Sequence, residues 1–144
     1  MATYLITGSC GTVGSALVKQ LSTENCNHSI RCVDNNESLL FFQQRDHGKN
    51  ENVEIFLADV RDLDRLRNLM QKVDIVLHAA ALKHVVMCER SPIEAVQTNI
   101  LGVQNIIRSA VESRVKKVIF MSSDKAVNPT NVLGTSKLMG ERLI

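Results

Sequence analysis

Short apolar runs alternate with helically spaced apolar positions along the whole chain. The runs predict strands at residues 3–7, 29–34, 53–57, 74–78 and 118–122. Helical spacing predicts helices at about 12–22, 37–45, 63–70 and 92–112, and a further helix that begins at residue 135. This alternation is typical of βαβ units with right-handed crossovers. We therefore expect one α/β domain over residues 1–144, with a doubly wound parallel sheet in the order 3-2-1-4-5.

A glycine-rich loop follows the first predicted strand. Gly8, Gly11 and Gly14 have the spacing GxxGxxG, and a helical pattern begins at once after them. Free N–H groups and the positive end of the dipole make the start of such a helix a phosphate site. We predict a Rossmann-type dinucleotide site here, and a glycine-rich turn without a ligand is the alternative. The loop residues expected at the cofactor are Gly8, Cys10, Gly11, Thr12, Val13 and Gly14.

Acidic and small residues follow the next three strands. Asp34 stands 20 positions after Gly14, where an acid binds the adenosine ribose and repels a 2′-phosphate, so NAD is favoured and NADP remains possible. Capping of the next helix is compatible with that role. Asp59 and Val60 could hold the adenine ring, or Asp59 could be a helix N-cap. Ala79, Ala80 and Ala81 would let the backbone pass beneath the nicotinamide ribose, whereas His78 is interpreted as a core residue.

The composition is typical of a globular protein and narrows the class of partner. Hydrophobic residues make up 44%, charged residues 22%, and the net charge is +2. The basic residues are scattered, so we expect no nucleic-acid partner, and no apolar run is long enough for a membrane span. Four cysteines without metal-ligand spacing indicate reduced thiols in a cytoplasmic protein with no metal site. Cys10 is interpreted as a small filler of the turn rather than a reactive thiolate.

The predicted helix over residues 92–112 has a strong start signal and two apolar faces. Ser91, Pro92 and Glu94 match an N-cap, a first-turn proline and a capping box. Leu101 and Ile106 extend the apolar surface to a second side. Such a helix is buried, or it packs against a second copy of the chain. We expect a homo-oligomer through this helix.

Four motifs together resemble one family. They are Thr7-Gly8-Ser9-Cys10-Gly11-Thr12-Val13-Gly14, residues 78–85, residues 99–102, and Ser122-Ser123-Asp124-Lys125-Ala126-Val127-Asn128-Pro129-Thr130-Asn131. The chain resembles the extended short-chain dehydrogenase/reductases, and within them the UDP-N-acetylglucosamine 4,6-dehydratases of polysaccharide biosynthesis. The resemblance covers essentially the whole chain.

The resemblance implies an activity and roles for particular residues. The family oxidises the sugar C4 hydroxyl with NAD, eliminates water across C5 and C6, and returns the hydride to C6. Ser123 would bond the C4 oxygen, Asp124 would be the acid, and Lys125 would be the base if burial or a charge lowers its pKa. Asn99 and Lys137 would contact the cofactor, and Lys137 belongs to the catalytic set. From the residues alone, the pair Asp124–Lys125 is more simply a solvated loop pair.

Two departures from the family pattern keep other functions open. Position 133, four residues before Lys137, carries leucine where most such enzymes have a catalytic tyrosine. Family members also continue well beyond residue 144, into a C-terminal region that binds the UDP-sugar. An NAD(P)-binding module without turnover is therefore an alternative, and a nucleotide-sugar epimerase is a weaker one.

Overall fold

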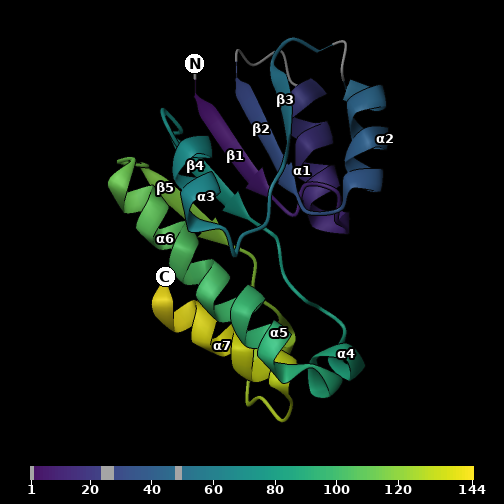
Figure 1. The fold of residues 1–144 in the computed structure, drawn as a ribbon, viewed down its shortest axis with the longest axis vertical. Coiled ribbons are helices and arrows are strands. Elements are labelled where there is room, and N and C mark those ends of the chain that lie inside the picture. Colours follow the sequence, from purple (N-terminus) through teal and green to yellow (C-terminus); the bar gives the residue numbers. More distant parts are fainter. Residues whose placement is uncertain (1, 24–27, 48–49) are drawn as a thin grey trace.

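The fold is a parallel sheet flanked by helices (Figure 1). The computed structural model describes residues 2–23, 28–47 and 50–144. Its five strands are β1 (Thr3–Thr7), β2 (Ser29–Asp34), β3 (Val53–Leu57), β4 (Ile75–His78) and β5 (Lys117–Phe120). All pairings are parallel and the strand order is β3-β2-β1-β4-β5. The predicted fold class and strand order are confirmed.

Both faces of the sheet are covered, because apolar side chains alternate along its strands and each face meets helices. Helices α3 (Leu63–Leu69) and α6 (Gly102–Glu112) lie on one face, and α1 (Thr12–Thr23) lies on the other. The first face joins Leu5, Val33 and Val76 to Leu66 and Ile106. The second face joins Ile6, Cys32 and Leu77 to Val18. The sheet is thereby fixed as a rigid support for the loops at its carboxyl end.

The predicted helix over residues 92–112 is interrupted. It consists of α5 (Pro92–Val96), a π-helical turn η1 (Gln97–Leu101) and α6, and the N–H of Gly102 bonds to the carbonyl of Gln97 five residues earlier. Ser91 makes no side-chain capping bond, so the expected capping box is wrong. Leu101 is 46% exposed rather than buried. Single-turn π segments of this kind are frequent at functional sites.

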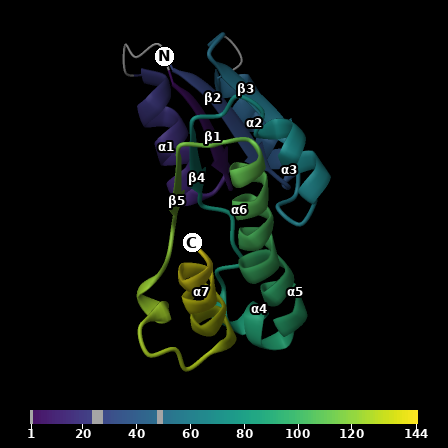
Figure 2. The same ribbon diagram turned by 90° about the vertical axis from the view of Figure 1, so that its left-hand side faces the viewer.

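A smaller helical layer lies beyond the carboxyl ends of the strands (Figure 2). It contains α4 (Val85–Arg90), α5 and α7 (Val132–Leu143), held together by buried Cys88, Ala95 and Leu133. The short helix η2 (Asp124–Ala126) leads into α7. Helix α7 begins three residues before the predicted start because the side chain of Asn131 accepts a capping bond from the N–H of Gly134.

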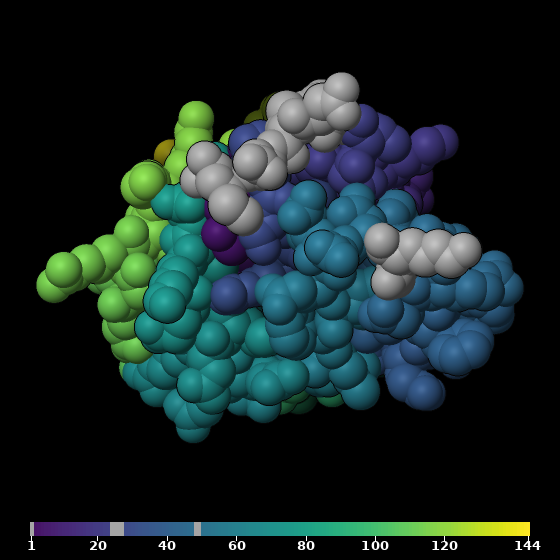
Figure 3. Space-filling view, turned by 90° about the horizontal axis from the view of Figure 1, so that it is seen from above, coloured from purple at the N-terminus to yellow at the C-terminus, as the bar shows by residue number. Residues whose placement is uncertain are grey.

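Helix α2 (Glu37–His47) packs beside the edge strand β3. Figure 3 shows the end of the molecule opposite the helical layer, where blue segments of the chain lie on the right and teal segments lie toward the lower left. Among the described residues, no helix is long and apolar enough to cross a membrane. Cys26, one of the four cysteines, lies outside the described residues.

Candidate cofactor-binding site

A cleft of about 300 Å³ opens where β1, β2, β3 and β4 end. The carboxyl ends of parallel strands meet at one edge of the sheet, and ligands of such folds bind there. The structure gathers most of the predicted cofactor residues in this cleft. They are Gly8, Gly11, Thr12, Val13, Gly14, Asp34, Asp59, Val60, Ala79, Ala80 and Ala81.

The three glycines of the loop have different roles. Gly8 has φ +68°, and a Cβ there would lie 2.6 Å from the backbone nitrogen of Ala80. A Cβ on Gly14 would collide with the carbonyl of Gly8, so these two glycines are required by the packing of the chain itself. A Cβ on Gly11 would only approach the Gly8 oxygen to 3.3 Å. Gly11 also lines the cleft, so the absence of a side chain there suits the close approach of a ligand.

The first turn of α1 offers N–H groups to the cleft. The first helical hydrogen bond is donated by Ser15 to Gly11 at 2.8 Å. The N–H groups of the three preceding residues, Thr12, Val13 and Gly14, come before this bond in the helix and have no partner four residues back. All three residues line the cleft. Their amides and the helix dipole fit an anionic phosphate group.

Asp34 shapes the loop and still has acceptor capacity. Its Oδ2 accepts the N–H of Cys10 at 3.0 Å, and its Oδ1 accepts the N–H of Asn36 at 3.0 Å. The N-cap of α2 is Asn36, which accepts the N–H of Leu39, so the capping role considered for Asp34 is wrong. Each carboxylate oxygen keeps a second lone pair, which can accept a ribose hydroxyl.

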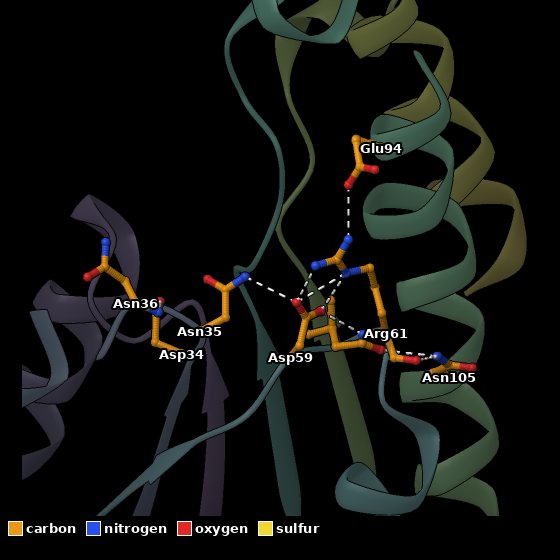
Figure 4. Close-up of polar contacts among 8 residues, drawn as sticks. Asp34, Asn35, Asn36, Asp59, Arg61, Glu94 and Asn105 are labelled. Carbon is orange, nitrogen blue, oxygen red and sulfur yellow. Dashed lines mark hydrogen bonds and ion pairs between the residues drawn. The ribbon is translucent and has the colours of Figure 1, made fainter. Parts of the chain in front are cut away.

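Asp59 is held by Arg61 and Asn35 (Figure 4). Its Oδ1 accepts the backbone N–H and Nε of Arg61, at 2.9 and 3.0 Å, and its Oδ2 accepts Arg61 Nη2 at 2.7 Å and Asn35 Nδ2 at 3.2 Å. Burial raises the pKa of Asp59, but the bonds and charge of Arg61 outweigh it and the pKa is lowered. All four acceptor positions of the carboxylate are used. An adenine amino group would have to displace one of these donors.

The N-cap role considered for Asp59 is wrong, because Asp62 caps α3 by accepting the N–H of Arg65 at 2.9 Å. The same network contributes cleft residues that sequence reasoning missed. Arg61 Nη1 donates to Glu94 of α5 at 2.9 Å, so an ion pair spans the cleft wall between the β3–α3 loop and the helical layer (Figure 4). The polar residues directly after β3 could have indicated Arg61 as a residue of the cleft. The local sequence gives no sign that Arg61 pairs with Glu94.

Ser123, Asp124 and Lys125 form a hydrogen-bonded group outside the cleft. Ser123 Oγ donates to Asp124 Oδ1 at 3.0 Å, and Lys125 Nζ lies 3.3 Å from the same oxygen. The bond from Ser123, and then that from Lys125, lower the pKa of Asp124, which favours its ionised form over the acid expected of it. The side chains of Asp124 and Lys125 are 86% and 46% exposed, so burial, one of the two causes considered for a base at Lys125, is not found.

Lys137, in contrast, is buried and 6% exposed. Its Nζ donates to the carbonyl of Met121 at 2.8 Å and lies 4.7 Å from the ring centre of Phe120. Burial lowers the pKa of Lys137 to about 8. Leu133, one turn earlier, packs with Cys88 and Ala95 in the helical layer, so its position belongs to a small core.

Two other predicted cofactor residues do not line the cleft. Asn99 is 2% exposed, and its amide bonds to the backbone N–H and carbonyl of Leu82 at 2.9 and 3.0 Å. It therefore holds the loop after β4, with Leu82 itself at the cleft. The side chain of Cys10 faces Ser9 and Gln43. Burial, with the charge of Asp34, raises the pKa of Cys10 to about 11, which agrees with a filler rather than a thiolate.

His78 is fully buried at the end of β4. Its Nδ1 and the hydroxyl of Thr7 are 2.6 Å apart, and in the described part of the chain its Nε2 has no hydrogen-bond partner. Burial, and to a smaller extent Lys137, lowers the pKa of His78 to about 3, so the ring is neutral. Across residues 2–23, 28–47 and 50–144, no three His, Cys, Asp or Glu side chains are grouped to hold a metal ion.

The fold and the cleft define a Rossmann-type nucleotide-binding protein. The family described as "Polysaccharide biosynthesis protein" matches residues 4–144. The chain belongs to this family, which confirms the family-level resemblance found in the motifs.

The curated relatives that match this chain are much longer than it. A Methanocaldococcus jannaschii protein named "Uncharacterized membrane protein MJ1061" is 49% identical over 98% of this chain and 42% of its own length. A UDP-N-acetylglucosamine 4,6-dehydratase (inverting) of Campylobacter jejuni is 40% identical over 96% of this chain and 41% of its own. This chain thus spans about two fifths of the curated relatives it matches.

Solved structures share the fold closely. Pen from Bacillus thuringiensis has a TM-score of 0.95 and 40% identity, covering 99% of this chain and 44% of that protein. A UDP-glucose 4-epimerase from Stenotrophomonas maltophila, solved with bound NAD and formylated UDP-arabinopyranose, has a TM-score of 0.86 and 26% identity. It covers 99% of this chain and 47% of the epimerase.

Proposed function

We propose that this chain is the cofactor-binding part of an NAD-dependent nucleotide-sugar 4,6-dehydratase that acts on a UDP-N-acetylglucosamine-type sugar. The observation that carries the proposal is the cleft itself, because its walls combine the glycine at position 11, the first amides of α1 and the carboxylate of Asp34. The 40% identity to the Campylobacter jejuni dehydratase supports the reaction class.

In this proposal each wall of the cleft binds one part of NAD. The amides of Thr12, Val13 and Gly14 would bind the pyrophosphate, and Asp34 would accept the ribose hydroxyls and disfavour NADP. The small side chains of residues 79–81 would leave room for the nicotinamide ribose. When bound, NAD supplies the acceptor and later the donor of a hydride.

The hydrogen-bonded group Ser123, Asp124 and Lys125 is proposed to bind the sugar and move its protons. Ser123 Oγ would donate to the C4 oxygen, Lys125 would remove the proton at C5, and Asp124 would protonate the leaving C6 hydroxyl. The lowered pKa of Asp124 opposes its role as an acid in the free chain. A bound sugar that separates Asp124 from Lys125 and excludes water would raise that pKa.

Lys137 is proposed to act beside the nicotinamide ribose, since its buried amine donates one hydrogen bond and a lysine ammonium has three donors. We also propose that two copies associate through the helical face over residues 92–112. Its exposed apolar side chains support this assembly. They are Ile93, Val96, Leu101 and Val111.

Two other functions have specific support. Leucine at position 133, where most such enzymes carry a catalytic tyrosine, favours a binding module without turnover. The likeness to the Stenotrophomonas maltophila epimerase favours an epimerase.

Incubating the chain with NAD and UDP-N-acetylglucosamine, and weighing the product by mass spectrometry, separates the three. Loss of one water with formation of a 4-keto sugar supports the dehydratase. A sugar of unchanged mass but altered C4 configuration by NMR indicates the epimerase. NAD binding with no change in the sugar indicates the module.

A further inference from the structure

One side chain behind the cleft, Gln43 of α2, pairs with the glycine-rich loop through both ends of its amide. Gln43 Nε2 donates to the backbone carbonyl of Ser9 at 2.9 Å, and the hydroxyl of Ser9 donates to Gln43 Oε1 at 2.9 Å. The thiol of Cys10 faces the same Oε1 at 3.7 Å. Gln43 is 8% exposed and Ser9 is fully buried, so these bonds are made away from water.

The amide of Gln43 is unusual on its helix face. Leu40, one turn earlier, fills the equivalent inward position with an apolar side chain. A buried amide costs free energy unless it is hydrogen-bonded, and a leucine of similar size would fill the space without that cost. The described polar contacts of the Gln43 side chain are with Ser9 and Cys10. The amide of Gln43 therefore stabilises the conformation of the glycine-rich loop.

Ser9 and Cys10 connect Gly8 to Gly11, both of which line the cleft. The end of β2 fixes their backbone on one side, because Ser9 N–H bonds to the carbonyl of Val33 and Cys10 N–H bonds to Asp34. Gln43 fixes the carbonyl of Ser9 on the side of α2. The direction of the Ser9–Cys10 peptide sets where the next amides point. It also sets the bond that orients Asp34.

We propose that Gln43 is a positioning residue for the cofactor: through Ser9 it holds the glycine-rich loop so that the first amides of α1 face a diphosphate. The inference rests on the proposed function, since it concerns the same cleft. Gln43 itself does not line the cleft, so its effect on a ligand passes through Ser9 and Cys10.

The test compares Gln43→Leu with Gln44→Leu, the same chemical change on the neighbouring, exposed position of α2. Each protein is titrated calorimetrically with NAD, with ADP and with adenosine, which has no phosphate. We expect Gln43→Leu to lower the affinity for NAD and for ADP by roughly tenfold, the equivalent of one to two lost hydrogen bonds. Gln44→Leu should bind both as the wild type does. The expected loss for adenosine is smaller than that for ADP.

Gln43→Glu provides a second variant that keeps the length of the side chain. Its carboxylate at pH 8 cannot donate to the Ser9 carbonyl, whereas its protonated form at low pH can. We expect the NAD affinity of Gln43→Glu, relative to the wild type at the same pH, to recover as pH falls. A merely structural role would lower thermal stability without this pH-dependent recovery and without separating ADP from adenosine.

The outcomes are distinguishable. If the wild type binds NAD and Gln43→Leu binds it equally well, the positioning role is wrong and the proposed function stands. If the wild type binds neither NAD nor ADP, the proposed function fails, and the role of Gln43 fails with it. If Gln43→Leu does not fold, the pH series on Gln43→Glu decides. A ratio of its NAD affinity to that of the wild type that does not change with pH contradicts the proposal.

Discussion

Replacing Lys137 with methionine should change how the stability of the protein depends on pH. Burial lowers the pKa of Lys137 from 10.5 to about 8, so the folded state disfavours the protonated amine. One pKa unit corresponds to about 1.4 kcal/mol, which puts the cost of keeping Lys137 protonated at about 3 kcal/mol. The cost applies in full at pH values below the pKa of Lys137 in the folded state, and it vanishes at pH values above its pKa in the unfolded state. The wild type therefore loses this stability as pH falls from about 10.5 to about 8.

Urea denaturation of both proteins between pH 6 and pH 11 measures the effect. We expect the stability of Lys137→Met relative to the wild type to fall by about 3 kcal/mol as pH rises through this window. Lys19→Met, the same chemical change at an exposed lysine of α1, is the matched control. Parallel curves for Lys137→Met and the wild type would refute the argument that Lys137 is desolvated.

Three further predictions concern the cleft. Gly14→Ala should destabilise the fold by about 2 kcal/mol in thermal denaturation because its Cβ meets the Gly8 carbonyl. Gly11→Ala, which meets only the Gly8 oxygen at 3.3 Å, should still fold but bind NAD more weakly. Asp34→Ser should lower the calorimetric preference for NAD over NADP by at least about tenfold, and an unchanged ratio would exclude Asp34 from the ribose. Asn99→Leu should lower the free energy of unfolding in urea by about 2 kcal/mol, because the backbone of Leu82 loses its bonds to the Asn99 amide. An unaltered urea midpoint would contradict that role of Asn99.

The fold was predictable because it depends on local patterns. Alternating burial on β1, with Leu5 and Ile6 facing opposite helices, is visible in the sequence as a short apolar run. Right-handed crossovers restrict the possible topologies, 3-2-1-4-5 is a common doubly wound order among them, and parallel strands bring the loops after β1, β2 and β3 to one edge. The glycine spacing and Asp34 could therefore be placed in one cleft without coordinates.

Long-range pairing was not predictable. Ser91 and Glu94 match the sequence of a capping box, but Glu94 bonds to Arg61, which lies 33 residues away. The π turn depends on which carbonyl each N–H selects, and a helical apolar period does not report that choice. Gln43 begins a run of polar residues over 43–47, and only the tertiary structure shows which of them meets Ser9.

The burial of Lys125 and Lys137 also required coordinates. The resemblance made Lys125 the base if burial or a neighbouring charge lowered its pKa, whereas the structure exposes 46% of that side chain and buries Lys137. Burial is decided by how η2 and α7 pack, and nothing in the local sequence of either lysine reports it.

The most direct test of the account is an NMR titration of the labelled chain with NAD, followed at the backbone amides. We predict that the largest shifts occur at Gly11, Thr12 and Val13, with smaller ones after β2 and β4. Saturable binding whose shifts leave these three amides unmoved, or no binding at all, would contradict the claim that the cleft holds a pyrophosphate against the start of α1.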